Sequence, residues 1–249
     1  MFAEQYLVDA EALLEKIHTT QMGAIQTAAM AQSIAAERAV YLFGSGHSVL
    51  PILDIFPRYG SYPGFRPILD PRLMWFNVTG PGGARELLWL ERQEGYIKNV
   101  LLSYHLDPRD TMIVFSHGGL NAAPVEMALE AKAKGLTVVA VTCLANRALN
   151  QPTHSSGKSL PDIADVVIDS CTPPEDALVS VDGLKTKVAA SSTLAVVAIS
   201  MALLAETTGE LAKLGKLPER VFVSPNVNDV PKSNNEQVFR DYEAFVAKL

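Results

Sequence analysis

The first 37 residues carry apolar side chains at the spacing of an amphipathic helix. These side chains recur close to every 3.6 residues, and Gly23 offers a possible break in the run. We expect two packed helices or one long kinked helix, serving either as a dimerisation element or as a cover for the chain's own sheet. The apolar positions are Leu7, Leu13, Leu14, Ile17, Ile25, Ala28 and Ala29.

Four short apolar runs follow, without the alternation that a half-exposed strand shows. They predict strands at 39–43, 111–115, 136–141 and 166–168. Continuous β-branched runs indicate strands covered on both faces, and helical segments between them favour right-handed βαβ connections. The pattern therefore predicts a three-layer α/β/α sandwich with a central parallel sheet, preceded by N-terminal helices.

No composition shift divides the chain, so we expect one domain. Residues 57–83 are rich in proline, glycine and aromatic residues and are expected to run over the sheet edge. Residues 221–223 are expected to add an edge strand, followed by an exposed arm. The domain spans 1–249, with a helical element at 1–37, an α/β core at 38–215 and a C-terminal tail at 216–249.

Composition limits the classes of partner. Of the 249 residues, 48% are hydrophobic and 19% charged, which is enough apolar surface for a sizeable core. The net charge of −6 gives no electrostatic footprint for nucleic acid or for an anionic membrane. A bound phosphate would therefore have to be held locally, by backbone amides and hydroxyls.

The cysteines and the apolar stretches exclude further classes. Cys143 and Cys171 have neither CxxC spacing nor a histidine at zinc-ligand distance, so we expect two reduced and largely buried thiols. We also expect neither a metal nor a cofactor. No basic leader precedes an apolar segment, and the longest apolar stretch, Leu194–Ala205, is too short to cross a bilayer. These patterns predict a cytoplasmic protein without a membrane segment.

Two predicted strands end in loops rich in glycine and serine, and these loops are the candidate site. Gly44–Ser48 and Ser116–Asn121 each supply backbone amides and hydroxyls ahead of a helix, an arrangement that suits phosphate. The same residues also serve as ordinary turn and N-cap residues. Two such loops in one sheet favour a ligand. The individual residues are Gly44, Ser45, Gly46, His47, Ser48, Ser116, His117, Gly118, Gly119 and Asn121.

Three better-known motifs fail on spacing. The first loop has Val49 where a dinucleotide fingerprint needs its third glycine. Residues 156–159 imitate the end of a P-loop, but Pro152 occupies the position of the leading glycine. No GxSxG nucleophile elbow is present.

Together these loops and the start of the last apolar helix resemble the sugar isomerase (SIS) domain. Ser191 and Ser192 open that helix, and segments such as 90–96 and 121–130 are similar to the branch with phosphoheptose isomerases and little-characterised sugar-isomerase-domain proteins. The resemblance implies a flavodoxin-like or Rossmann-like topology and a phosphorylated sugar as ligand. It places the phosphate on the second loop, with help from Ser45 and Ser48 of the first.

The chain departs from that family pattern at several positions. Gly118 stands where the second loop usually has its second serine, which removes one hydroxyl donor. The catalytic His and Glu of phosphoheptose isomerases correspond to Asp54 and Arg58, and the final helix holds neither Gln nor His. The resemblance therefore does not carry over a zinc site.

Aldose–ketose isomerisation requires a base near C1 and C2 and a proton donor. Asp54, on the helix after the first loop, is our preferred base, although it is equally an ordinary helix carboxylate. Glu126 fits a helix-dipole role better than a catalytic one. Glu91 and Glu94 are expected on a solvated helix face. The remaining candidates, as catalytic or sugar-contacting groups, are His47, His117, His154 and Lys158.

The sequence thus predicts a sugar-phosphate-binding protein, most simply an isomerase that works through an enediolate. The alternatives are a non-catalytic sugar-phosphate sensor and an etherase acting on a sugar-acid phosphate. The N-terminal helices and the apolar last helix also predict a homo-oligomer, a dimer or a tetramer.

Overall fold

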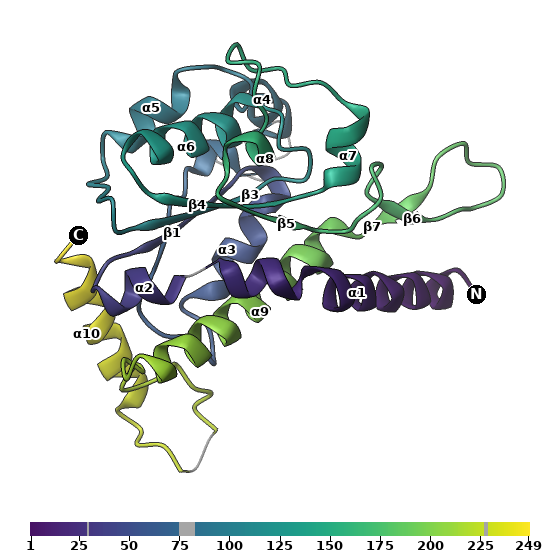
Figure 1. The fold of residues 1–249 in the computed structure, drawn as a ribbon. Coiled ribbons are helices and arrows are strands. Elements are labelled where there is room, and N and C mark those ends of the chain that lie inside the picture. Colours follow the sequence, from purple (N-terminus) through teal and green to yellow (C-terminus); the bar gives the residue numbers. More distant parts are fainter. Residues whose placement is uncertain (29, 75–82, 227–228) are drawn as a thin grey trace.

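A five-stranded parallel sheet forms the centre of the molecule in the computed structural model, which describes residues 1–28, 30–74, 83–226 and 229–249 (Figure 1). The strand order is β2-β1-β3-β4-β5, and every residue of β1 and β3 is buried. The predicted parallel sheet with both faces covered is confirmed. The strands are β1 (Val40–Gly44), β2 (Phe65–Pro67), β3 (Thr111–Phe115), β4 (Thr137–Thr142) and β5 (Val166–Asp169).

Helices cover both faces of this sheet, so the predicted three-layer sandwich is also confirmed. Successive residues of a strand belong to two separate hydrophobic cores, one on each face of the sheet. Leu42 and Ile113 belong to one core, and Tyr41 and Met112 belong to the other. One layer comprises α1 (Phe2–Thr27), α2 (Met30–Ala35), α3 (Leu50–Ile55) and α9 (Ser192–Lys213). The other comprises α4 (Gly83–Leu90), α5 (Tyr96–Leu101), α6 (Ala122–Ala133), α7 (Leu144–Leu149) and α8 (Leu160–Ile163).

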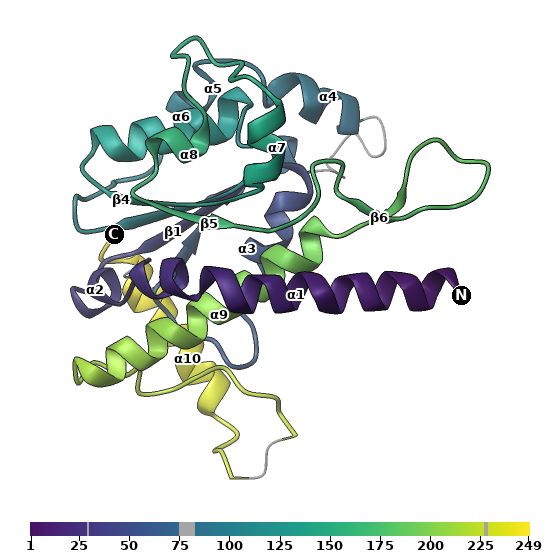
Figure 2. The same cartoon turned by 45° about the vertical axis from the view of Figure 1, so that its right-hand side comes forward.

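The predicted N-terminal helices are present, but the break does not fall at Gly23, which lies inside α1. The second half of α1 packs on α9 and β5, whereas its first turns extend beyond the sheet. Beside them projects an antiparallel hairpin of β6 (Ala177–Val179) and β7 (Val188–Ala190) (Figure 2). The Tyr6 hydroxyl donates to the Ala190 carbonyl at 3.0 Å and joins the two projections.

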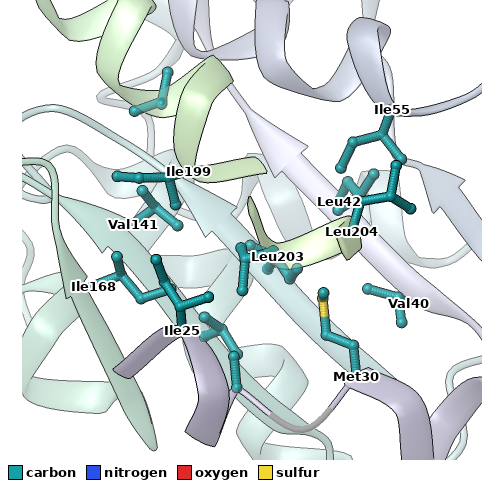
Figure 3. Close-up of a cluster of buried hydrophobic side chains, with 14 of the residues drawn as sticks. Ile25, Met30, Val40, Leu42, Ile55, Val141, Ile168, Ile199, Leu203 and Leu204 are labelled. Atoms are coloured by element: carbon teal, nitrogen blue, oxygen red, sulfur yellow. The ribbon is translucent and has the colours of Figure 1, made fainter. Parts of the chain in front are cut away.

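α9 is longer than the apolar stretch from which it was predicted. Among the described residues it is the one helix whose length and composition would let it cross a membrane, although such a helix also occurs in the core of soluble proteins. Here its apolar side chains pack into the core; Figure 3 shows Ile199, Leu203 and Leu204 against Val141 and Leu42 of the sheet.

The tail differs from its prediction. Residues 221–223 do not form an edge strand; β2 holds that edge, and Phe222 instead exchanges two backbone hydrogen bonds with Gly60 and Ser61. The expected exposed arm contains α10 (Asn234–Val246), which buries Val238 in the core. In the 57–83 segment, β2 and the 3-10 turn η2 (Pro71–Leu73) run along the sheet edge, and 75–82 lie outside the described residues.

Candidate functional site

The two candidate loops leave the sheet side by side. β1 and β3 are hydrogen-bonded neighbours, and Gly44, the last residue of β1, pairs with Phe115, the last of β3. The chain continues from β1 through the 3-10 turn η1 (Gly46–Val49) into α3 on one face, and from β3 into α6 on the other. In a sheet of this order, the crevice between strands that depart to opposite faces is the usual ligand site.

Glycine is needed where the first loop folds back on its strand. A Cβ on Gly44 would lie 2.3 Å from the Ser48 carbonyl oxygen, so no larger residue fits. Gly46 has a φ of +60°, which L side chains adopt at a cost. These two positions let η1 start directly at the strand end, and so bring Ser48 and His47 over the crevice.

The second loop is shaped by Gly119. Its φ is +64°, a Cβ there would meet Thr142 Oγ1 at 3.0 Å, and its N–H donates to Ser116 Oγ at 3.1 Å. Among the described residues, the amides of His117, Gly118 and Leu120 have no protein acceptor. Such a loop ahead of a helix N-terminus presents several donors to an anion.

Glu91 connects the two loops. Ser45 Oγ donates to its Oε2 and Asn121 Nδ2 to its Oε1, both at 2.8 Å. The residue is 8% exposed, and burial raises the pKa of its carboxyl above the ordinary value, although the Ser45 hydrogen bond and Arg92 oppose this. The prediction of a solvated face is therefore wrong for Glu91, because the side chain turns inward from the end of α4.

A pocket of about 190 Å³ opens at the carboxyl ends of the strands. Four predicted site residues line it: His47, Ser48, His117 and Ser192. They come from η1, the second loop and the start of α9, so the fold brings together residues that are far apart in the sequence. Its other lining residues are Val141, Thr142, Ser170, Asp176, Thr193 and Val196.

His117 is held in place within this pocket. Its Nε2 lies 3.1 Å from the Pro174 carbonyl oxygen, so that nitrogen carries the proton in the neutral ring and donates. Nδ1 lies 3.5 Å from the Thr172 hydroxyl. The backbone carbonyl of His117 accepts from the Cys143 amide at 3.0 Å, which fixes the loop against the end of β4.

Asp176 caps the start of α9. Its carboxylate accepts from the amides of Ser191 and Ser192 at 3.0 and 2.6 Å, and from the Ser192 hydroxyl at 2.8 Å. Burial raises the pKa of Asp176, but the hydrogen bonds from Ser192 and Ser191 and the nearby His117 outweigh it, and the pKa is lowered overall. The pocket therefore contains an ionised carboxylate at neutral pH.

Other predicted residues lie outside the pocket. The structure places Asp54 in an ion pair with Arg58 at 2.9 Å, beside a separate depression near Phe222. The carboxylate of Glu126 accepts from the backbone amides of Gly95 and Ile97 at the start of α5, rather than facing the loops' crevice.

The 151–159 loop is tied to the turn between α4 and α5. His154 Nε2 lies 3.7 Å from Glu94 and 3.9 Å from Glu126, and its side chain is 8% exposed. The amide of Ser155 donates to Glu94 at 2.7 Å, so Glu94 is partly engaged rather than fully solvated. Lys158, at the far side of this loop, is exposed.

Several pocket residues were not found from the sequence. Thr142 and Ser170 follow or end β4 and β5, so the rule that ligands bind at carboxyl ends of strands would have included them. Asp176 carried no such signal, because it lies in an irregular segment before β6. In the part of the chain that the structure describes, no three His, Cys, Asp or Glu side chains gather as a metal site would require.

Comparison with known proteins agrees with the resemblance found in the sequence. Residues 5–143 match the family described as the SIS domain, which is more than half of the chain. A UPF0309 protein of Caldanaerobacter subterraneus subsp. tengcongensis is 35% identical over 234 residues, covering 92% of this chain and 93% of the relative. A UPF0309 protein of Streptomyces avermitilis is 32% identical over 244 residues, covering 96% and 94%.

Among solved structures, a phosphoheptose isomerase from Francisella tularensis is similar with a TM-score of 0.49 and 16% identity, over 82% of this chain and 95% of that one.

Proposed function

The chain belongs to the SIS domain family, and from that premise we propose that it binds a phosphorylated sugar in the strand-end pocket and acts as an aldose–ketose isomerase. The observation that carries the proposal is the meeting of two donor-rich loops at the β1/β3 strand ends, where Gly44 pairs with Phe115. An anion bound there needs no basic surface, which fits a chain with a net charge of −6.

The second loop supplies the phosphate donors in this proposal. The amides of His117, Gly118 and Leu120 have no acceptor among the described residues, and α6 begins directly after Asn121. The hydroxyls of Ser48 and Ser192 line the adjoining pocket and suit the sugar's own hydroxyls. Each charge-assisted bond to phosphate contributes about 1.5–3 kcal/mol.

We assign proton transfer to His47 rather than to Asp54. Asp54 is engaged with Arg58 away from the pocket, and the Asp176 carboxylate already accepts hydrogen bonds from Ser191 and Ser192. His117 has its Nε2 occupied by the Pro174 carbonyl. His47 lines the pocket from the start of η1, and an imidazole side chain can both accept and donate a proton.

A second candidate function, a non-catalytic sugar-phosphate sensor, is favoured by a specific feature of the same pocket. Its carboxylate, Asp176, is committed to capping α9 and is not arranged as a free base. A pocket of hydroxyls and imidazoles without a free carboxylate is sufficient for binding.

The test is turnover of a panel of aldose and ketose phosphates, with exchange at C2 followed by NMR in deuterated water. Isomerisation with C2 exchange, lost in His47→Gln and retained in Asp54→Asn, supports the isomerase. Binding without exchange supports the sensor, and exchange with lactate release from a sugar-acid phosphate supports the etherase. Absence of binding by every sugar phosphate would refute the shared premise.

We further infer that the chain assembles with copies of itself through the projecting end of α1 and the β6–β7 hairpin. Phe2, Leu7 and Val8 are 62%, 61% and 54% exposed, and Leu184 between β6 and β7 is 57% exposed. The start of α1 and the hairpin project from the same side of the body (Figure 2). Light scattering of the wild type and of Leu7→Glu tests this: a wild-type oligomer that the variant weakens is expected, and a monomeric wild type contradicts it.

A further inference from the structure

A second pocket, a solvent-open depression of about 630 Å³, lies between β2, the loop after α5 and the end of α10. Arg66 and Pro67 of β2 form its floor, Ser103 and Tyr104 one wall, and Tyr242 part of the other. Glu243, Val246 and Ala247 complete the lining from α10. A cavity of several hundred cubic ångströms is the size that small organic ligands occupy.

The Arg66 guanidinium is held over aromatic rings rather than by an acid. Its Cζ lies 5.8 Å from the centre of the Tyr41 ring and 5.2 Å from that of Tyr104, and Nη1 is 3.5 Å from the Tyr41 hydroxyl. No carboxylate in the described part of the chain lies within 4.0 Å of it. The arginine is half-buried and lines the pocket, and its guanidinium has no anionic partner within that distance.

Two tyrosines beside Arg66 are likewise incompletely satisfied. Tyr104 and Tyr242 are half-buried, and neither hydroxyl has a hydrogen-bond partner among the residues that the structure describes. Burial raises the pKa of both, against the opposing charge of Arg66, so both hydroxyls stay protonated and able to donate. Both hydroxyls are therefore available to donate to a molecule bound in this pocket.

The aromatic rings that line this pocket pack against other rings. The Tyr104 ring meets Tyr41 edge-on at 6.1 Å, and Tyr41 is fully buried in the core. The Tyr242 ring packs on Phe56 at 4.8 Å. Rings fixed in this way offer stacking surface at little entropic cost on binding.

The cavity is separate from the strand-end pocket. Arg66 pairs with Tyr41 near the start of β1, and Tyr104 precedes β3, whereas the first pocket opens where both strands end. Figure 1 shows α10 at the opposite end of the strands from the start of α9. The two sites share no lining residue.

We propose that this cavity binds a small organic anion with a planar ring, its carboxylate or phosphate paired with Arg66 and its ring stacked against Tyr104 and Tyr242. Arginine recognises either anion through paired N–H groups, and the tyrosines supply aromatic faces and hydroxyl donors. Glu243, exposed at the edge of the same pocket, disfavours an occupant that carries several negative charges.

Calorimetric titration with 4-hydroxybenzoate and with AMP tests the proposal and distinguishes a carboxylate from a phosphate. 4-Hydroxybenzyl alcohol and adenosine are the uncharged counterparts. At least one anion is expected to bind, and its neutral counterpart to bind at least tenfold more weakly. Arg66→Met, which keeps the aliphatic stem, is expected to weaken binding about ten- to a hundredfold, as loss of a charge-assisted contact does.

Tyr104→Phe tests ligand binding without disturbing the fold, because it removes only the hydroxyl and keeps the ring that packs on Tyr41. A severalfold loss of affinity with unchanged thermal unfolding is expected. Arg240→Met, at a 65% exposed arginine on α10, is the matched control and should bind as the wild type does. Failure of both anions to bind at millimolar concentration, or equal binding by Arg66→Met, would overturn the proposal.

Discussion

Replacement of Glu91 tests how the two ligand loops are joined. In Glu91→Ala, the Ser45 hydroxyl and the Asn121 amide each lose a carboxylate acceptor at 2.8 Å inside a region where Glu91 itself is 8% exposed. Hydrogen bonds to a charged group contribute about 1.5–3 kcal/mol each, and burial of the carboxylate offsets part of that sum. We expect the free energy of unfolding to fall by about 3 kcal/mol.

Glu91→Gln should cost less, about 1 kcal/mol, since its carbonyl accepts from Asn121 and its amide donates to a reoriented Ser45 hydroxyl. The pH dependence has a definite sign. The folded-state pKa of Glu91 lies above the ordinary 4.5, so the folded state keeps a proton that the unfolded chain has released. That contribution to stability is complete below pH 4.5 and is lost as the pH rises through the folded-state pKa.

Urea unfolding across the range from pH 4.5 to neutrality measures both effects. The stability advantage of the wild type over Glu91→Gln should shrink as the pH rises, whereas Glu11→Gln, an exposed α1 control, should track the wild type throughout. Two results would refute the reasoning. One is a free energy of unfolding for Glu91→Ala within about 0.5 kcal/mol of the wild type at neutral pH. The other is a stability difference between the wild type and Glu91→Gln that grows as the pH rises.

Three further substitutions follow from the contacts. Gly44→Ala should lose about 2 kcal/mol or more, because the new Cβ would lie 2.3 Å from the Ser48 carbonyl oxygen; chemical denaturation measures this. Asp110→Ala should lose about 3–5 kcal/mol, because it leaves Arg38, whose side chain is 11% exposed, without its partner at 2.9 Å; thermal unfolding measures this. Gly118→Ser should change stability by less than about 0.5 kcal/mol, since its Cβ would meet nothing closer than 3.4 Å, and calorimetry would then show whether the family's usual serine tightens sugar-phosphate binding.

Each of these three substitutions has a control substitution of the same residue type elsewhere in the protein. Gly23→Ala, in an open position of α1, should stabilise the protein by about 0.5–1 kcal/mol, opposite in sign to Gly44→Ala. Asp107→Ala removes the partner of Arg109, whose side chain is 62% exposed, and should cost less than about 1 kcal/mol. Gly119→Ser, at a φ of +64°, should be destabilising where Gly118→Ser is not. Equal effects within any pair would contradict the contact on which it rests.

Much of the fold follows from local pattern. The apolar runs at 39–43, 111–115, 136–141 and 166–168 each became strands, because a residue buried on both sides must be apolar wherever it falls in the strand. The three residues of β2 were missed, since Phe65–Pro67 is too short to show a period and lies among prolines and glycines. The 221–223 run was overpredicted for the converse reason: it is apolar because Phe222 packs on Phe56 and Tyr59.

The sequence likewise predicted some features of the candidate site and not others. Glycines and hydroxyls at strand ends are readable in the sequence, because tight turns and helix starts require those residue types locally. Burial of Glu91 is not readable, since a glutamate at the end of an exposed helix and one that accepts from Ser45 and Asn121 have the same sequence pattern. The separation of Asp54 from the pocket likewise is not readable, because it depends on the direction of α3, which places Asp54 beside Arg58 and Phe222.

The sequence alone therefore determined the three layers, the parallel sheet and the two donor-rich loops, all of which depend on residues close together in the chain. Only the tertiary structure decided which side chains share a cavity: His47 with His117 and Asp176 at one end, and Arg66 with Tyr104 and Tyr242 at the other. The physical reason is that strand order and helix direction, fixed by packing over the whole chain, choose the neighbours of each polar group.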